Sequence, residues 1–98
     1  MRKKGRVDAT QPEIVSALRR AGCSVLVMSN LGGGAPDIAV GRVVRPGFKV
    51  NIFLELKDGN LPPSKQKLTF DEQEFHNSWR GPIFVVGSVE EAFKAVGL

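Results

Sequence analysis

The sequence has little of what marks a disulfide-stabilised, zinc-binding or membrane-spanning protein. Its single cysteine, Cys23, cannot form a disulfide within the chain, and with no leader-like segment this favours a reducing, cytoplasmic location. Its single histidine, His76, has no second histidine with which to form a zinc site. No apolar run approaches the ~18 residues that a membrane span requires, so we expect no membrane association.

The chain also lacks repeats, low-complexity tracts and linkers, and its 98 residues predict one domain. Acidic residues are outnumbered by basic ones, with a net charge of +4, which favours an anionic partner such as nucleic acid. The excess is strongest at the N-terminus, in MRKKGR, which contains no acid. This segment has the composition of a mobile arm that contacts phosphates or, alternatively, of a solvated basic tail.

Three helix starts are marked by capping boxes, in which a hydroxyl residue precedes a glutamate by three positions. The boxes begin at Thr10, Thr69 and Ser88. They predict helices over about 11–22, from 70 to about 80, and near the C-terminus.

Four apolar segments between these helices have the pattern of strands: 23–29, 37–44, 48–57 and 83–87. Arg45-Pro46-Gly47 predicts a turn that joins the second and third into a hairpin. The fourth is short and uninterrupted, as in a strand covered on both faces. Since a helix precedes it, a parallel crossover is expected. The predicted fold is α/β, in the order α-β-β-β-α-β-α, with a mixed sheet flanked by helices.

Charged residues occur where this hairpin begins and ends. Glu55 and Lys57 alternate with apolar residues, so both side chains point to the same face of their strand. Asp37 stands eighteen positions before Glu55, at the start of the other strand. Because the start of one hairpin strand lies beside the end of the other, we expect Asp37 to adjoin Glu55 and Lys57.

Two adjacent carboxylates repel each other unless a cation lies between them, and Mg²⁺ prefers such oxygen ligands. A lysine beside them can orient or deprotonate a water molecule or stabilise charge on a phosphate. The ordinary alternative is a Glu55–Lys57 ion pair on a solvated strand. Either motif alone is a weak signal, but Asp37 joined to Glu-x-Lys by a hairpin of this length is more specific.

These motifs resemble the PD-(D/E)-x-K nuclease superfamily, and more narrowly the small stand-alone VRR-NUC domains (virus-type replication-repair nucleases) of phages. The resemblance spans about residues 10–95 and is carried by Glu13, GGGAPD, LELK and the segment from 68 to 93. It implies a restriction-endonuclease-like α-β-β-β-α-β core, with residues 1–9 as a basic arm and 10–98 as the nuclease domain.

The resemblance also implies the site residues. Asp37, Glu55, the main-chain carbonyl of Leu56 and Glu13 would bind Mg²⁺ or Mn²⁺, and Lys57 would serve the attacking water. Gln73 corresponds best to the family's glutamine in the following helix, with Gln66 as a competitor. Glu13 also has a structural alternative, as the third residue of its capping box, and Gln73 could be an ordinary exposed helix residue.

Three glycines before Asp37 lack the Gly-Lys-Ser/Thr ending of a phosphate-binding P-loop. We interpret them as allowing a sharp turn and a close approach of DNA. Trp79, one helical turn after Phe75, is interpreted as a core residue packed on that ring.

The leading hypothesis is a Mg²⁺- or Mn²⁺-dependent endodeoxyribonuclease acting on branched DNA, similar in use to Holliday junction resolvases and hence homodimeric. The alternatives are a monomeric flap or nicking nuclease and a non-catalytic nucleic-acid-binding module with a nuclease fold. The residues expected to contact DNA phosphates are Arg2, Lys3, Lys4, Arg6, Lys65 and Lys67.

Overall fold

The computed structural model describes residues 3–62, 64 and 67–98, and for residues 3–9 it describes the backbone alone. Seven elements follow in the expected order: α1 (Lys3–Arg20), β1 (Ser24–Val27), β2 (Ile38–Arg45), β3 (Phe48–Leu56), α2 (Phe70–Ser78), β4 (Ile83–Val86) and α3 (Val89–Ala95). None of the helices in this part of the chain is both long and apolar enough to cross a membrane.

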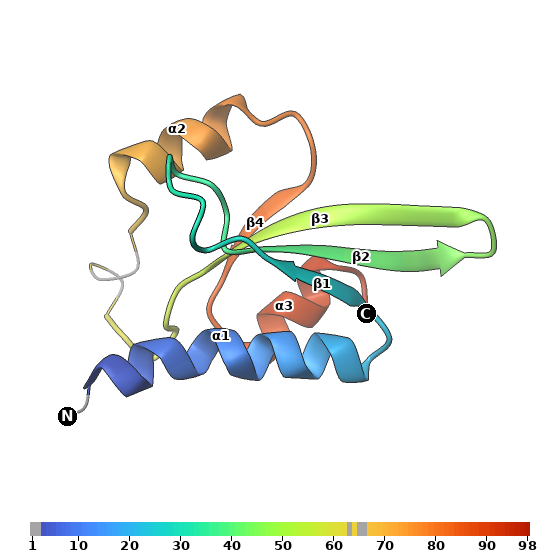
Figure 1. Cartoon of the computed structure of the whole chain (residues 1–98), viewed down its shortest axis with the longest axis horizontal. Coiled ribbons are helices and arrows are strands. Elements are labelled where there is room, and N and C mark those ends of the chain that lie inside the picture. Colours follow the sequence, from blue (N-terminus) through green and yellow to red (C-terminus); the bar gives the residue numbers. More distant parts are fainter. Residues whose placement is uncertain (1–2, 63, 65–66) are drawn as a thin grey trace.

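The four strands form one mixed sheet in the order β1-β2-β3-β4. The first three pair antiparallel, and β4 pairs parallel with β3 after the crossover through α2. Helices α1 and α3 lie against one face of the sheet, while α2 stands beyond the other face (Figure 1). The predicted fold class is therefore confirmed.

The core lies between the sheet and the pair α1 and α3. Ile14 and Leu18 of α1 meet Val40 and Leu54 of the central strands, and all four are almost fully buried. Helix α2, by contrast, contains no buried residue. The central strands are thus anchored from one side only, and their opposite face is left to other contacts.

The hairpin of β2 and β3 is the longest strand pairing of the sheet. It turns at Pro46-Gly47, where Gly47 has φ 81°, a backbone conformation that glycine adopts without a steric penalty. A register shift between Val43 and Arg45 lies near the turn, and the hairpin projects beyond the rest of the molecule (Figure 1). The predicted turn is confirmed.

The predicted start of the first helix is wrong, because α1 begins at Lys3 and runs through Thr10 and Pro12. A capping residue must be non-helical, so Thr10 does not cap this helix. Pro12 cannot donate a hydrogen bond to the carbonyl four residues earlier, and its ring crowds that carbonyl, so the helix continues through it at a cost. The helical segment before it combines helix formers (Lys3, Lys4, Arg6 and Ala9) with Gly5, which disfavours a helix.

The other two helix starts are confirmed. Thr69 forms the complete reciprocal box with Glu72. Ser88 accepts a hydrogen bond from the N–H of Glu91, although the carboxylate of Glu91 binds the N–H of Gly87 rather than that of Ser88.

Strand β4 is not covered on both faces as predicted. It forms an edge of the sheet, and Phe84 and Val85 are 43% and 44% exposed. A short apolar run does not distinguish an edge strand from a central one, because the difference lies in which strands pair with it.

Candidate active site

The hairpin brings Asp37 and Glu55 together. Ile38 pairs with Leu54, and the same register continued by one residue sets Asp37 opposite Glu55. The N–H of Leu56 donates a hydrogen bond of 2.7 Å to Asp37 Oδ2. The adjacency expected from the spacing of the two motifs is thus present in the structure.

Glu55 is the one charged residue in the described part of the chain that is buried, with 2% of its surface exposed. Its Oε1 atom is buried and makes no hydrogen bond there. Burial, together with the neighbouring carboxylates of Asp37 and Glu72, raises the pKa of Glu55 to about 9. This carboxyl group therefore holds a proton at neutral pH unless another cation takes the proton's place.

Lys57 lies on the same side as Glu55, at the end of β3. Its Nζ is 3.9 Å from Glu55 Oε2 and 3.0 Å from Glu72 Oε1. The backbone N–H of Lys57 donates to the carbonyl of Val86, which extends the pairing of β3 and β4 past the strand end. The ammonium group is therefore fixed between one carboxylate of the hairpin and one of α2.

Glu72 is a site residue that the sequence interpretation missed. Its Oε1 accepts from the N–H of Thr69 at 2.9 Å and from Lys57 Nζ at 3.0 Å. Burial alone would raise the pKa of Glu72, but the hydrogen bonds from Thr69, Lys57 and Glu55 bring it below its usual value. The capping box located this carboxylate, and was interpreted only as a helix start.

A tight contact fixes α2 above the hairpin. Gly34 has φ +83°, and a Cβ atom at this position would collide with the backbone of Asp71. The glycine-rich loop before Asp37 therefore packs directly on the first turn of α2, which carries Glu72. The sharp turning expected of these glycines is confirmed by positive φ angles at Gly32, Gly33 and Gly34.

Gln73 does not face this cluster. It is exposed, and its amide donates a hydrogen bond of 3.0 Å to Asn77 Oδ1 one turn along the helix. Gln66, its competitor, lies outside the described residues. On the part of α2 that faces Lys57, Glu72 contacts the ammonium directly, and His76 follows one turn later. Burial and the charge of Lys57 lower the pKa of His76, against the opposing effect of Glu72.

Glu13 lies on the exposed side of α1. The α1 residues that border the cavity beside Asp37 are instead Thr10, Gln11 and Pro12. This cavity has a volume of about 380 Å³ and is completed by Ser29, Leu56 and Asp58. Gln11 Nε2 donates to Ser29 Oγ across it, at 3.5 Å. The structure thus unites Asp37, Glu55 and Lys57 with Leu56 beside them, and leaves Glu13 apart.

The expected phosphate contacts are only partly described. Lys67 is exposed, shortly before α2. Lys3, Lys4 and Arg6 belong to the first two turns of α1, where only the backbone is described. Arg2 and Lys65 lie outside the described residues.

Within residues 3–62, 64 and 67–98, no three acidic, histidine or cysteine side chains are grouped closely enough to form a ready metal cage. A hard cation such as Mg²⁺ needs fewer protein ligands, since it binds through one or two carboxylates and takes its other oxygens from water and phosphate. The buried, unpartnered oxygen of Glu55 beside Asp37 fits such a cation.

Comparison with solved structures finds a protein of similar fold. A solved structure described as a VRR_NUC domain superposes with a TM-score of 0.61 and 26% sequence identity, covering 93% of this chain and 94% of that one. No family model and no curated protein sequence matches the chain. The chain therefore has the fold of a VRR_NUC domain, as its motifs indicated.

Proposed function

We propose that this chain, having the fold of a VRR_NUC domain, is a metal-dependent endonuclease that hydrolyses phosphodiester bonds in DNA. The observation that carries the proposal is the buried Glu55 carboxyl, with an unpartnered oxygen, held between Asp37 and Lys57. An isolated buried carboxylate is costly, and a purely structural site would gain stability from an apolar residue there.

Asp37 and Glu55 would hold Mg²⁺ or Mn²⁺, with the main-chain carbonyl of Leu56 as a further oxygen donor. When bound, the cation would polarise the scissile phosphate and lower the pKa of water. The hydrogen bond from the Leu56 N–H orients the Asp37 carboxylate from the strand side. Glu13, exposed on α1, is a weaker candidate ligand than these three groups.

Lys57 would act on the reacting groups. Its ammonium can donate hydrogen bonds to the attacking water and to the phosphate oxygen on which charge accumulates. Glu72 holds this ammonium at 3.0 Å, and Thr69 in turn holds Glu72, so the donor is positioned before substrate arrives. Glu72, rather than Gln73, would be the positioning residue of α2.

The preferred substrate in this proposal is branched DNA, with the four-way junction first, cut by a homodimer. A junction has two-fold symmetry, and a two-fold dimer supplies two sites for paired cuts. Support comes from the projecting hairpin, where Val43, Val44 and Phe48 are each about half exposed. A lone small domain gains nothing from apolar side chains in that position.

The direct test is incubation with four-way junction, flap, single-stranded and duplex DNA, with Mg²⁺ or Mn²⁺ or with EDTA. We expect metal-dependent cleavage, strongest on a branched substrate, and its loss in Asp37→Asn but not in the exposed-carboxylate control Glu90→Gln. A folded Asp37→Asn protein that cuts at the normal rate would contradict the assignment of the site. Light scattering with and without junction DNA tests whether the protein is a dimer. A particle with the mass of one chain under both conditions, together with unpaired nicks in the junction, would exclude a resolvase but not a nuclease.

The N-terminal basic segment is proposed to contact DNA phosphates without reading sequence. Because α1 includes Lys3, Lys4 and Arg6, glutamine substitution at all three tests this without removing helix. We expect the slope of log K against log salt to flatten by up to ~0.9 for each phosphate that the protein no longer neutralises. An unchanged slope would show that these side chains do not touch DNA, and Lys94→Gln on α3 serves as the control.

A further inference from the structure

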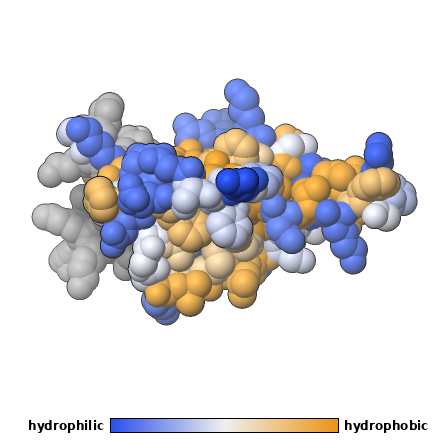
Figure 2. All heavy atoms as spheres, turned by 90° about the horizontal axis from the view of Figure 1, so that it is seen from above, coloured by the Kyte–Doolittle hydropathy of each residue, from blue (hydrophilic) through white to orange (hydrophobic). Residues whose placement is uncertain are grey.

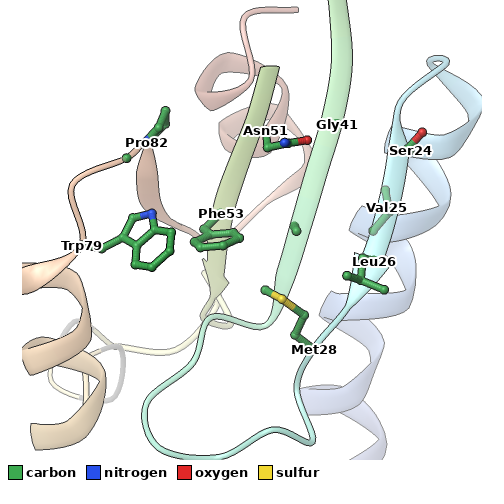
Figure 3. A pocket seen from close by; sticks show the side chains of 11 residues that line it. Ser24, Val25, Leu26, Met28, Gly41, Asn51, Phe53, Trp79 and Pro82 are labelled. Carbon is green, nitrogen blue, oxygen red and sulfur yellow. The ribbon is translucent and has the colours of Figure 1, made fainter. Parts of the chain in front are cut away.

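The sheet face opposite α1 and α3 contains an apolar cavity of about 650 Å³. One wall is formed by Phe53 and Trp79, and the other by Leu26 and Met28, with Pro82 near the tryptophan (Figure 3). Figure 2 views this side of the molecule and shows hydrophobic side chains over its middle and along the projecting hairpin. The volume lies within the range of pockets that take small organic groups.

The aromatic wall is preformed. The Trp79 ring stacks on Phe75 at 5.3 Å and meets Phe53 at 4.9 Å between centroids. The expected contact with Phe75 is confirmed, but Trp79 is not a core residue, because 44% of its surface is exposed. The Trp79 ring is held on one side by Phe75 and Phe53, and part of its surface is exposed. It can therefore stack on a flat ring of a ligand with little further loss of side-chain entropy.

Small residues form the floor of the cavity and so leave it open. Ala39 and Gly41 of β2 line it beside Asn51 of β3. A Cβ atom at Gly41 would approach Asn51 Oδ1 to 3.2 Å, so a larger residue would crowd this end. The Asn51 amide and the Ser24 hydroxyl are the polar side chains at that end, and both can hydrogen-bond the edge of a flat polar ring.

The cavity lies on the same face of the sheet as the candidate active site. Side chains alternate along a strand, so Asp37 shares its sheet face with Ala39 and Gly41. By the same rule Glu55 shares that face with Phe53, which pairs with Ala39. Two to four strand residues span roughly 7–14 Å, which corresponds to about two to four stacked nucleotides.

Positive charge follows on the far side of the cavity. Between Ile38 and Leu54 the hairpin carries Arg42, Arg45 and Lys49 and no acidic residue. Lys49 and Gly41 border a second hollow, of about 280 Å³, which shares Asn51 with the first cavity. Arg42 donates to the carbonyls of Val96 and Gly97 on the α3 side, and Arg45 lies over Phe48, so Lys49 is the hairpin cation that alternation puts on the open face. That face therefore presents, in order, two carboxyl groups, an aromatic hollow and a lysine.

We propose that this face holds an unpaired stretch of the DNA strand beside the scissile phosphate. Its bases stack on Trp79 and Phe53, and its phosphates face Lys49. Base–aromatic stacking with a basic groove is the general mode of single-strand recognition. In a duplex the faces of the bases are stacked on one another, and phosphates do not bind favourably to an apolar cavity. Duplex DNA therefore fits this cavity poorly. A second copy of this chain fits this cavity less well, because each copy carries a net charge of +4, and the dimer proposed above would use the projecting end of the hairpin instead.

This inference rests on the proposed nuclease function and adds a requirement for unpaired nucleotides beside the cut, which a flap offers directly and a four-way junction offers where base pairs at its branch point open. It is tested by binding, without cleavage. Trp79 is the sole tryptophan and the chain has no tyrosine, so intrinsic emission above the phenylalanine region reports on this cavity alone. The intact protein is titrated in EDTA with a thymidine oligonucleotide and with an abasic one of equal length and charge.

We expect the thymidine strand to quench Trp79 emission and to bind at least about tenfold more tightly than the abasic strand, as one stacked base would produce. Trp79→Ala should remove this preference and Trp79→Phe should keep most of it. Phe70→Ala, which alters a ring that is 78% exposed outside the cavity, should change nothing.

Equal binding of both strands without quenching would overturn the inference while leaving the nuclease proposal intact. Binding of neither strand would overturn it as well, and the cleavage assay would then decide separately whether the protein acts on DNA. A change of emission with protein concentration alone, together with a two-chain mass, would assign the face to a second copy instead. If Trp79→Ala does not fold, the unsubstituted protein still tests the inference, through its relative affinity for the thymidine strand and the abasic strand.

Discussion

Replacing Lys57 with alanine should lower the rate of DNA cleavage by at least ~10²-fold, the usual contribution of a positioned acid–base group. Affinity for DNA should change only modestly, because the ammonium is held between Glu55 and Glu72 and acts mainly on charge that develops during the reaction. Single-turnover cleavage and equilibrium binding, measured on the same branched substrate, separate the two effects.

Two controls make the result specific. Lys94→Ala removes an exposed lysine on α3 and should leave the rate unchanged. Glu72→Gln keeps an oxygen acceptor for the Thr69 N–H but removes the charge that holds Lys57, so its rate should fall between those of the other two variants. If Lys57→Ala is slowed less than about tenfold, the contact of Lys57 with Glu55 and Glu72 has a structural role and Lys57 does not act on the reacting groups.

Glu55→Gln should abolish cleavage and also change how stability depends on pH. Glu55 has a pKa of about 9 in the folded protein against an ordinary value of 4.5. Between these values the folded state binds more protons than the unfolded state, so the free energy of unfolding falls as pH rises. The slope from one such group is at most ~1.4 kcal/mol per pH unit.

Denaturant unfolding at pH 6 and pH 8, in EDTA, measures this effect. The unsubstituted protein should lose ~1–3 kcal/mol more than Glu55→Gln over this range. The exposed-carboxylate variant Glu74→Gln should behave like the unsubstituted protein. Mg²⁺ or Mn²⁺ should stabilise the unsubstituted protein more at pH 8, where less work is needed to displace the proton, and should have little effect on Glu55→Gln. Parallel pH dependences in all three proteins would contradict the burial of this carboxyl group.

The parts of the site that the sequence predicts are those set by short-range geometry. Strand alternation puts Glu55 and Lys57 on one face. Counting back from the turn at Pro46-Gly47 brings the start of β2 beside Glu55, which is enough to predict that Asp37 is near it. The register shift between Val43 and Arg45, which the sequence does not indicate, sets Asp37 rather than Ile38 opposite Glu55. The helix starts at Thr69 and Ser88 are equally local.

The parts that the sequence leaves open or mispredicts depend on tertiary structure. Gln73 and Glu72 are neighbours in sequence, but only the docking of α2 on the loop at Gly34 decides which one faces Lys57. The exposed position of Trp79 depends on which sheet face the helices cover. Thr10 fits the local pattern of a capping box, but α1 continues through it from Lys3. A rule based on single residues does not predict this continuation.

Helix α2 carries Glu72 yet contains no buried residue of its own. Its attachment to the sheet therefore has a smaller free energy than the global stability, and it belongs to the units of a protein that open first. Amide hydrogens of α2 should exchange with solvent well before those of β2 and β3. Each such opening releases Lys57 from one of its two carboxylate partners, so the preorganisation of the lysine is an equilibrium property that the protein can gain or lose without unfolding.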